Sequence, residues 1–278
     1  RFPEELGRVS HPPCRAAPRG PGGGEVPARG VLPPPRGRER TSPPSFHILR
    51  GPKEQADVLA NLTDIRAEIT TAAARVGRGP EDVAIVAAAK TVPATVVRWV
   101  LEAGITAVGE NYVAELREKA PALPEARWHF IGTLQRGTAQ HVADLADVVE
   151  TVSGEGALHR LAGRAVRRGR TIDVLIEVDF TTERSGVDPA DVPSVAGAIE
   201  ELPGVRLTGL MTIPPVPEVP EDARPYFQRL RTLRDDLRRT YPEVLDLSMG
   251  MSLDYPIAVE EGATMVRIGT ALFGPRAT

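Results

Sequence analysis

The stretch VAIVAAAKTVPATVV, residues 83–97, contains the pattern that decides the fold. Its first seven residues are apolar and small or β-branched, which is typical of a short strand buried on both faces of a sheet. Lys90 ends this run, Pro93 follows three residues later, and ATVVRWVLEAG then places apolar residues at helical spacing. The stretch therefore predicts one strand that passes directly into one helix, with a lysine at the junction.

This alternation of strand and helix continues along the chain. Further strands are predicted at 106–111, 127–133, 147–152, 173–180, 206–213, 245–251 and 264–274. Helical patterns separate several of them, and an amphipathic stretch at 56–77 precedes the first strand. Eight such strands within about 225 residues predict an α/β fold, a single (β/α)8 TIM-type barrel with a leading amphipathic helix. The alternative is an open, doubly wound parallel sheet.

Composition separates the first part of the chain from the rest. Residues 1–46 hold 11 of the 27 prolines and 7 of the 26 glycines, together with many arginines. Such a segment buries too little apolar surface to fold, so we expect a disordered Pro/Gly/Arg-rich leader followed by a barrel domain at 47–278. We interpret the leader as dispensable, and the alternative is a basic interaction tail or a targeting peptide.

The remaining composition excludes several classes of protein. A net charge of −3 on 278 residues gives no indication of a nucleic-acid partner. No apolar run reaches the ~20 residues of a membrane helix, and the first residues do not have the pattern of a secretory signal. We therefore expect a cytoplasmic protein without a membrane partner. The single cysteine, Cys14, predicts neither a disulfide nor a cysteine-based metal site.

Polar residues follow several of the predicted strands. In a (β/α)8 barrel the ligand site lies at the C-terminal ends of the strands, where these residues would meet. Lys90 beside apolar barrel walls is a candidate Schiff-base lysine, and the alternative is a charge that emerges into solvent. Asn111, at the end of the second strand, is a candidate for cofactor binding. Ser252 after the seventh strand, with Gly269 and Thr270 on the eighth, offers hydroxyls and backbone N–H groups to a phosphate, although Ser252 also fits a helix cap.

Longer strings of the sequence resemble one known family. AAAKTVP, GENYVAELREK, WHFIGTLQ, GLMTI and LSMGMSLDYPIAVEEGATMVRIGTALFG are similar to motifs of the pyridoxal-phosphate homeostasis proteins, also called the YggS or PROSC family. The fold of that family resembles the barrel domain of alanine racemase. The resemblance extends over roughly residues 54–275.

The resemblance implies a cofactor and the residues that bind it. Lys90 would carry pyridoxal 5′-phosphate (PLP) as an internal aldimine. Ser252, Gly269 and Thr270 would surround the phosphate, and Arg267 would face the pyridine nitrogen. No metal site is implied.

Arg267 would then influence the chemistry of the cofactor. A guanidinium only donates hydrogen bonds, so it can contact an unprotonated pyridine nitrogen but cannot stabilise a protonated one. The electron sink is thereby weakened, which favours amine exchange over transamination. The alternative is a structural ion pair between Arg267 and an acid such as Glu110 or Glu177.

These features predict a PLP-binding protein that stores, buffers or delivers the cofactor in the cell, rather than an enzyme. Racemases of similar fold take catalytic groups from a second domain, for which the four residues after Gly274 leave no room. We expect a monomer whose partners are PLP and PLP-dependent apoenzymes. Two alternatives stay open, a PLP-dependent amino-acid racemase of low activity and a Schiff-base aldolase that uses Lys90 directly.

Overall fold

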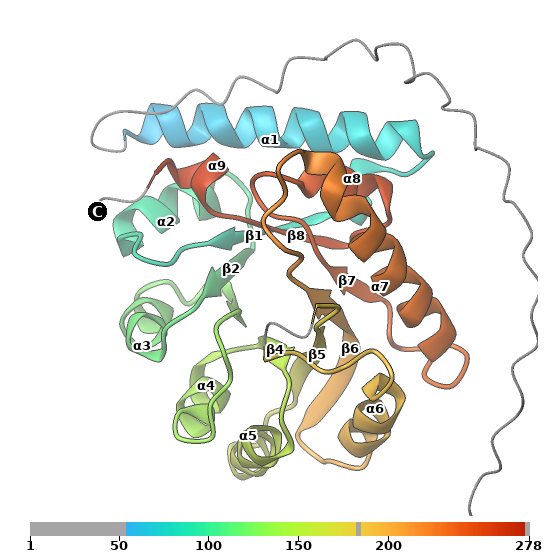
Figure 1. Ribbon diagram of the computed structural model, residues 1–278. Helices are drawn as coiled ribbons and strands as arrows, with labels where there is room; N and C mark the ends of the chain where they lie inside the picture. Colours follow the sequence, from blue (N-terminus) through green and yellow to red (C-terminus); the bar gives the residue numbers. More distant parts are fainter. Residues whose placement is uncertain (1–53, 182–184, 276–278) are drawn as a thin grey trace, which may run out of the picture. The chain divides into compact units, whose positions relative to one another are not determined.

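The strands of the protein close into a barrel, as Figure 1 shows. The structure is a computed structural model that describes residues 54–181 and 185–275. Eight parallel strands follow one another around the barrel in chain order: β1 (Ala84–Ala88), β2 (Ala107–Glu110), β3 (Arg127–Phe130), β4 (Val148–Val152), β5 (Ile172–Val178), β6 (Val205–Thr212), β7 (Asp246–Ser248) and β8 (Met265–Ile268). β1 pairs with both β2 and β8, and Val86 is in register with Ala107 and Arg267. The predicted (β/α)8 barrel is therefore confirmed, and the open-sheet alternative is wrong because an open sheet has two unpaired edges.

Helices form the layer outside the barrel. They are α1 (Gln55–Arg75), α2 (Ala94–Glu102), α3 (Val113–Ala122), α4 (Ala139–Leu145), α5 (Glu155–Arg167), α6 (Val192–Glu200), α7 (Arg224–Leu237), α8 (Tyr255–Glu260) and α9 (Thr270–Phe273), with the 3-10 turns η1 (Pro80–Asp82) and η2 (Pro220–Ala223). Because α9 has only four residues, α1 takes the last place in the ring, where it contacts α2, α8 and α9 (Figure 1). The predicted amphipathic stripe accounts for this packing, since α1 buries its apolar residues against the barrel.

The stretch predicted as a strand at 264–274 contains two elements. β8 ends at Ile268, and α9 begins at Thr270. Gly269 between them has φ −112° and ψ −81°, outside the β region, so the chain turns out of the sheet at this residue. The turn brings the start of α9 to the C-terminal end of the barrel.

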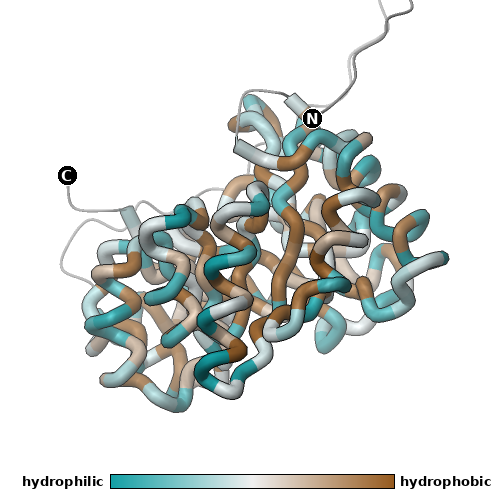
Figure 2. Tube along the Cα trace, turned by 90° about the horizontal axis from the view of Figure 1, so that it is seen from below, coloured by the Kyte–Doolittle hydropathy of each residue, from teal (hydrophilic) through white to brown (hydrophobic). Residues whose placement is uncertain are grey.

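Apolar side chains fill the barrel and the layer between strands and helices. Figure 2 shows hydrophobic and hydrophilic residues alternating along the helices, as expected for helices with one buried face. The interior of the barrel holds a cluster of Val86, Ala107, Val148, Leu175, Met211 and Met265. Residues two apart on a strand face the same side, so Glu150 lies one layer beyond Val148, and Arg267 one layer beyond Met265. The apolar interior therefore gives way to polar groups toward the C-terminal ends of the strands.

Within the described residues, each helix is too short or too polar to cross a bilayer. The same residues do not bring three or more His, Cys, Asp or Glu side chains together in an arrangement that could hold a metal ion. The predicted leader, residues 1–46, and Cys14 within it lie outside the described part of the chain.

Candidate functional site

Lys90 lies just beyond the C-terminal end of β1. Its side chain is half-buried, and its Nζ lies 5.1 Å from the centroid of the Tyr112 ring. A hydrogen bond from Ala89 N to Gly109 O (2.9 Å) continues the pairing of β1 and β2 up to the residue before Lys90. The lysine therefore leaves the sheet at the mouth of the barrel, beside an aromatic ring.

The full sequence contains only three lysines: Lys53, Lys90 and Lys119. The first lies outside the described residues. Lys119 on α3 is 4% exposed, and its ammonium donates hydrogen bonds to Glu110 Oε1 (2.7 Å), Glu115 Oε2 (2.7 Å) and Ala89 O (2.9 Å). An ammonium has three N–H donors, so Lys119 has none left for a ligand. Of the two lysines in the described part of the chain, Lys90 is the one whose amine is available.

A cavity of about 520 Å³ lies beyond the C-terminal ends of β2 and β3, and of the predicted site residues it is lined by Asn111 alone. Asn111 and Tyr112 line it on one side, and Gly132, Thr133 and Gln135 line it on the other. A side chain at position 132 could not be accommodated, because its Cβ would lie 2.0 Å from Asn111 O. The close approach of these two loops places the predicted ligand residue Asn111 at the edge of the cavity.

Ser252 joins the loop after β7 to the start of α9. Its Oγ accepts a hydrogen bond from Ala271 N at 3.0 Å. This bond brings Ser252 to the turn formed by Gly269 and Thr270, so the structure brings together the three residues predicted to surround a phosphate. Ser252 is indeed a cap, but of α9 and not of the helix that follows it in sequence.

Arg267 on β8 is buried inside the barrel, with 5% of its surface exposed. Its Nη1 donates to Ser248 O (2.8 Å) and Ser248 Oγ (2.7 Å), and its Nη2 donates to Thr212 O (2.9 Å). The carboxylate of Glu150 lies 3.9 Å from Nη1. Arg267 therefore has an acidic partner, but Glu110, proposed from the sequence for this role, instead pairs with a lysine.

Glu150 is fully buried on β4 and connects Arg267 to β3. Its Oε1 lies 2.6 Å from His129 Nδ1, and its Oε2 accepts a hydrogen bond from Ser248 Oγ at 2.5 Å. Burial raises the pKa of Glu150, but the contact with His129, the charge of Arg267 and the bond from Ser248 bring its pKa below the usual value. Burial also lowers the pKa of Arg267, against the attraction of the neighbouring carboxylates. The ionised carboxylate therefore supplies the counter-charge for the guanidinium.

The sequence contains a signal for this pair that the prediction missed. Glu150 stands within the predicted strand DVVETV, and Arg267 within the predicted strand TMVRIGTALFG. A charge buried in a strand requires a partner, so an acid and an arginine in two such strands are candidates for one another. No comparable local signal marks Lys119, whose pattern is that of any lysine on an exposed helix.

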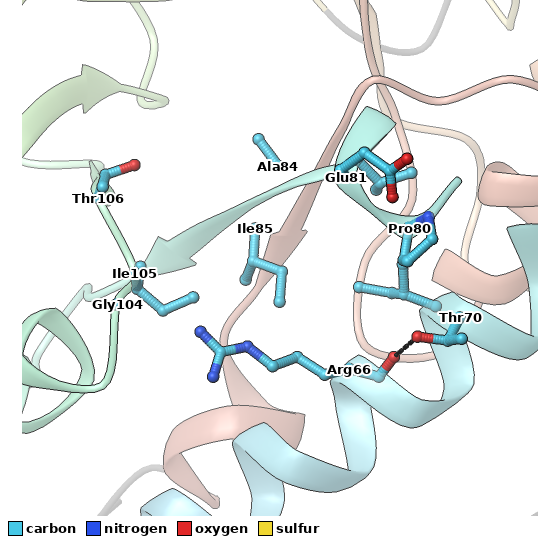
Figure 3. Close-up of a pocket in the computed structure, with 11 residues that line it drawn as sticks. Arg66, Thr70, Pro80, Glu81, Ala84, Ile85, Gly104, Ile105 and Thr106 are labelled. Atoms are coloured by element: carbon cyan, nitrogen blue, oxygen red, sulfur yellow. Dashed lines mark hydrogen bonds between the residues drawn. The ribbon is translucent and has the colours of Figure 1, made fainter. Parts of the chain in front are cut away.

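A second cavity, of about 430 Å³, lies at the opposite end of the strands (Figure 3). Arg66 on α1 lines one side of it, and residues that precede β1 and β2, such as Pro80 and Gly104, line the other. Arg66 reaches across from α1 and donates to Ala103 O at 2.9 Å. None of the predicted site residues lines this cavity, so the candidate site is the mouth that contains Lys90.

Comparisons with known proteins identify the family of this chain. The sequence matches the family described as alanine racemase, N-terminal domain, over residues 60–277. A pyridoxal phosphate homeostasis protein of Aquifex aeolicus is 42% identical over 220 residues, which cover 77% of this chain and 96% of the relative. A protein of the same name from Escherichia coli K12 is 36% identical over 233 residues, 79% of this chain and 97% of the relative.

Solved structures give a similar result. PipY of Synechococcus elongatus PCC7942, whose structure contains PLP, aligns with a TM-score of 0.70 at 32% identity, over 78% of this chain and all of that chain. An alanine racemase of Clostridium difficile aligns with a TM-score of 0.64 at 15% identity, over 80% of this chain and 58% of that chain. The second similarity concerns the fold alone.

Proposed function

Since this chain belongs to the family of pyridoxal phosphate homeostasis proteins, we propose that it binds PLP covalently through Lys90 and serves PLP homeostasis as a carrier. The resemblance deduced from the sequence motifs is thus confirmed at the level of the family. The observation that carries the proposal is the contrast between the two described lysines. Lys119 is enclosed by acceptors, whereas Lys90 stands at the mouth of the barrel with its amine available.

The residues at the mouth fit the parts of PLP. Lys90 offers a primary amine to the aldehyde. The hydroxyls of Ser252 and Thr270, with the backbone at Gly269, offer donors to the phosphate. Arg267 has five N–H donors, of which the hydrogen bonds recorded among the described residues use three, so two are left for the pyridine nitrogen.

Arg267 also favours a carrier over a catalyst. When bound, PLP supplies an aldehyde that condenses reversibly with amines and, if its ring is protonated, an electron sink. The guanidinium of Arg267 cannot accept a hydrogen bond, so it cannot stabilise a protonated ring nitrogen. Hydrogen bonds to Ser248 and Thr212 and the charge of Glu150 hold it in place. It therefore opposes protonation of the pyridine nitrogen and limits chemistry at an amino-acid Cα, while leaving amine exchange at Lys90 unaffected.

The proposed function extends to the proteins that receive the cofactor and to the state in which this protein acts. We propose that PLP-dependent apoenzymes are the recipients, and that the protein acts as a monomer in the cytoplasm. The position of Lys90 supports delivery, because Tyr112 beside it is 49% exposed and the amine therefore lies near the surface. An amine from solvent or from another protein can approach the same position.

The proposal is tested by titrating the purified protein with PLP and separating bound from free cofactor by gel filtration. We expect the wild type to retain about one equivalent with visible absorbance, and Lys90→Ala to lose the absorbance while keeping its circular dichroism spectrum. Equal retention by both proteins would refute covalent binding at Lys90. Deuterium exchange at Cα of added amino acids tests the racemase alternative, and rapid exchange by the wild type would contradict the carrier function.

A further inference from the structure

The peptide groups on both sides of Lys90 are anchored to α3. Before Lys90, Ala89 O accepts a hydrogen bond from Lys119 Nζ at 2.9 Å. After it, Thr91 N donates to Glu115 Oε2 at 2.8 Å. Lys119 and Glu115 are themselves paired at 2.7 Å, one helical turn apart. One ion pair therefore holds the backbone on either side of the reactive lysine.

The backbone at Thr91 needs such an anchor. Among the described residues, Thr91 is the single non-glycine residue with a positive φ, at 63°. A β-branched residue in this conformation is strained, and it persists only where surrounding contacts enforce it. The hydrogen bond from Thr91 N to a carboxylate is such a contact, and it is charge-assisted. Thr91 directly follows Lys90, so the contact that holds its N–H also holds the peptide group between Lys90 and Thr91.

Glu110 completes the cluster from the face of β2 that packs against α3. It is the last residue of β2, is fully buried, and accepts a hydrogen bond from Lys119 Nζ at 2.7 Å. Two carboxylates and the Ala89 carbonyl thus fix the ammonium from three directions. Burying such charges contributes little net stability, which indicates a role in geometry.

We propose that Lys119, Glu115 and Glu110 are positioning residues that fix the turn at Thr91 and thereby the amine of Lys90. The inference rests on the proposed function of Lys90. Lys119 takes no part in bonding to the cofactor, because its three donors are already used. Glu115 is the member that acts most directly, since among the three it is the one that accepts the hydrogen bond from Thr91 N.

The test compares three variants of the full-length protein. Glu115→Ala removes the acceptor of Thr91 N, and Glu115→Gln keeps an oxygen acceptor but not the charge. Arg98→Met is the matched control, because Arg98 on α2 pairs at 3.5 Å with Glu125, which lies between α3 and β3, and this pair does not include Thr91. Two quantities are measured: hydrogen exchange of the Thr91 amide in the protein without PLP, and the rate at which added PLP is trapped on Lys90 by cyanoborohydride.

In Glu115→Ala we expect exchange at Thr91 to be roughly tenfold faster or more, and trapping at Lys90 to be slower by a similar factor. Glu115→Gln should lie between Glu115→Ala and the wild type in the exchange rate at Thr91 and in the trapping rate at Lys90. Arg98→Met should match the wild type in both rates. Unchanged exchange at Thr91, or faster exchange with an unchanged trapping rate, would overturn the inference alone. A wild type that does not trap PLP on Lys90 would overturn the proposed function and the inference together.

Discussion

Replacing Glu110 by Gln should change how stability depends on pH. Glu110 is fully buried, and its Oε2 has no hydrogen-bond partner among the described residues. Burial raises the pKa of Glu110 to about 7, although the hydrogen bond and charge of Lys119 act in the opposite direction. The substitution removes this titration while keeping the size of the side chain and an oxygen that can accept from Lys119.

The sign of the effect follows from proton binding. Between about pH 4.5 and pH 7 the unfolded chain has lost the Glu110 proton, while the folded protein keeps it. Since the unfolded state then binds fewer protons, the free energy of unfolding falls as pH rises through this window. A rise in pKa from 4.5 to about 7 corresponds to on the order of 3 kcal/mol. This contribution is fully lost above about pH 7.

The assay is urea unfolding of the wild type and Glu110→Gln, without PLP, from about pH 4 to about pH 8. The difference in unfolding free energy should shift in favour of the variant by on the order of 3 kcal/mol across this range. Glu125→Gln is the control, because it removes a carboxylate from an exposed ion pair, which is worth at most about 1 kcal/mol. If the unfolding free energies of the wild type and Glu110→Gln changed with pH in parallel, Glu110 would have the same pKa in the folded and unfolded states, and the predicted effect would be wrong.

Three further results are expected. Ser252→Ala combined with Thr270→Ala should raise the dissociation constant of PLP by more than about tenfold in an equilibrium titration, and an unchanged constant would place the phosphate elsewhere. Arg267→Met should lower the free energy of unfolding by about 3–5 kcal/mol in denaturant titrations, because Glu150 loses its cation. Adding Glu150→Gln should recover part of that loss, and no recovery would mean that the pair is not coupled. A chain that begins at residue 47 should bind PLP like the full chain in the same titration, because the proposed site residues all lie beyond it; weaker binding would contradict this.

The fold could be predicted because its signals are local. The apolar run that ends in Lys90 is complete within a few residues, and each later strand repeats the pattern. In a parallel barrel the C-terminal ends of all strands lie on the same face. Lys90 and Ser252 could therefore be assigned to one site before any contact between side chains was known. This placement follows from the direction of the strands and not from side-chain contacts, so it also applies to residues far apart in the sequence.

The contacts within the site could not be predicted, because they depend on register and on packing between elements. The strands alone do not say that Arg267 reaches Glu150 across the barrel, and Glu110 was an equally reasonable partner. Lys119 has no distinguishing neighbours in sequence, and its importance follows from the approach of α3 to Ala89 O. Gly269 was read as part of a strand, because a single glycine does not specify whether a strand bends or ends.

Chemical labelling of the lysines shows whether Lys90 carries the cofactor. The purified protein is incubated with PLP, reduced with borohydride, digested and examined by mass spectrometry. The sequence contains three lysines, so the modified peptide can be assigned without ambiguity. The structure predicts one stable pyridoxyl group on the peptide that contains Lys90, and none on Lys119, whose amine is enclosed. A label on Lys119 or Lys53 in place of Lys90, or no label at all, would contradict the account.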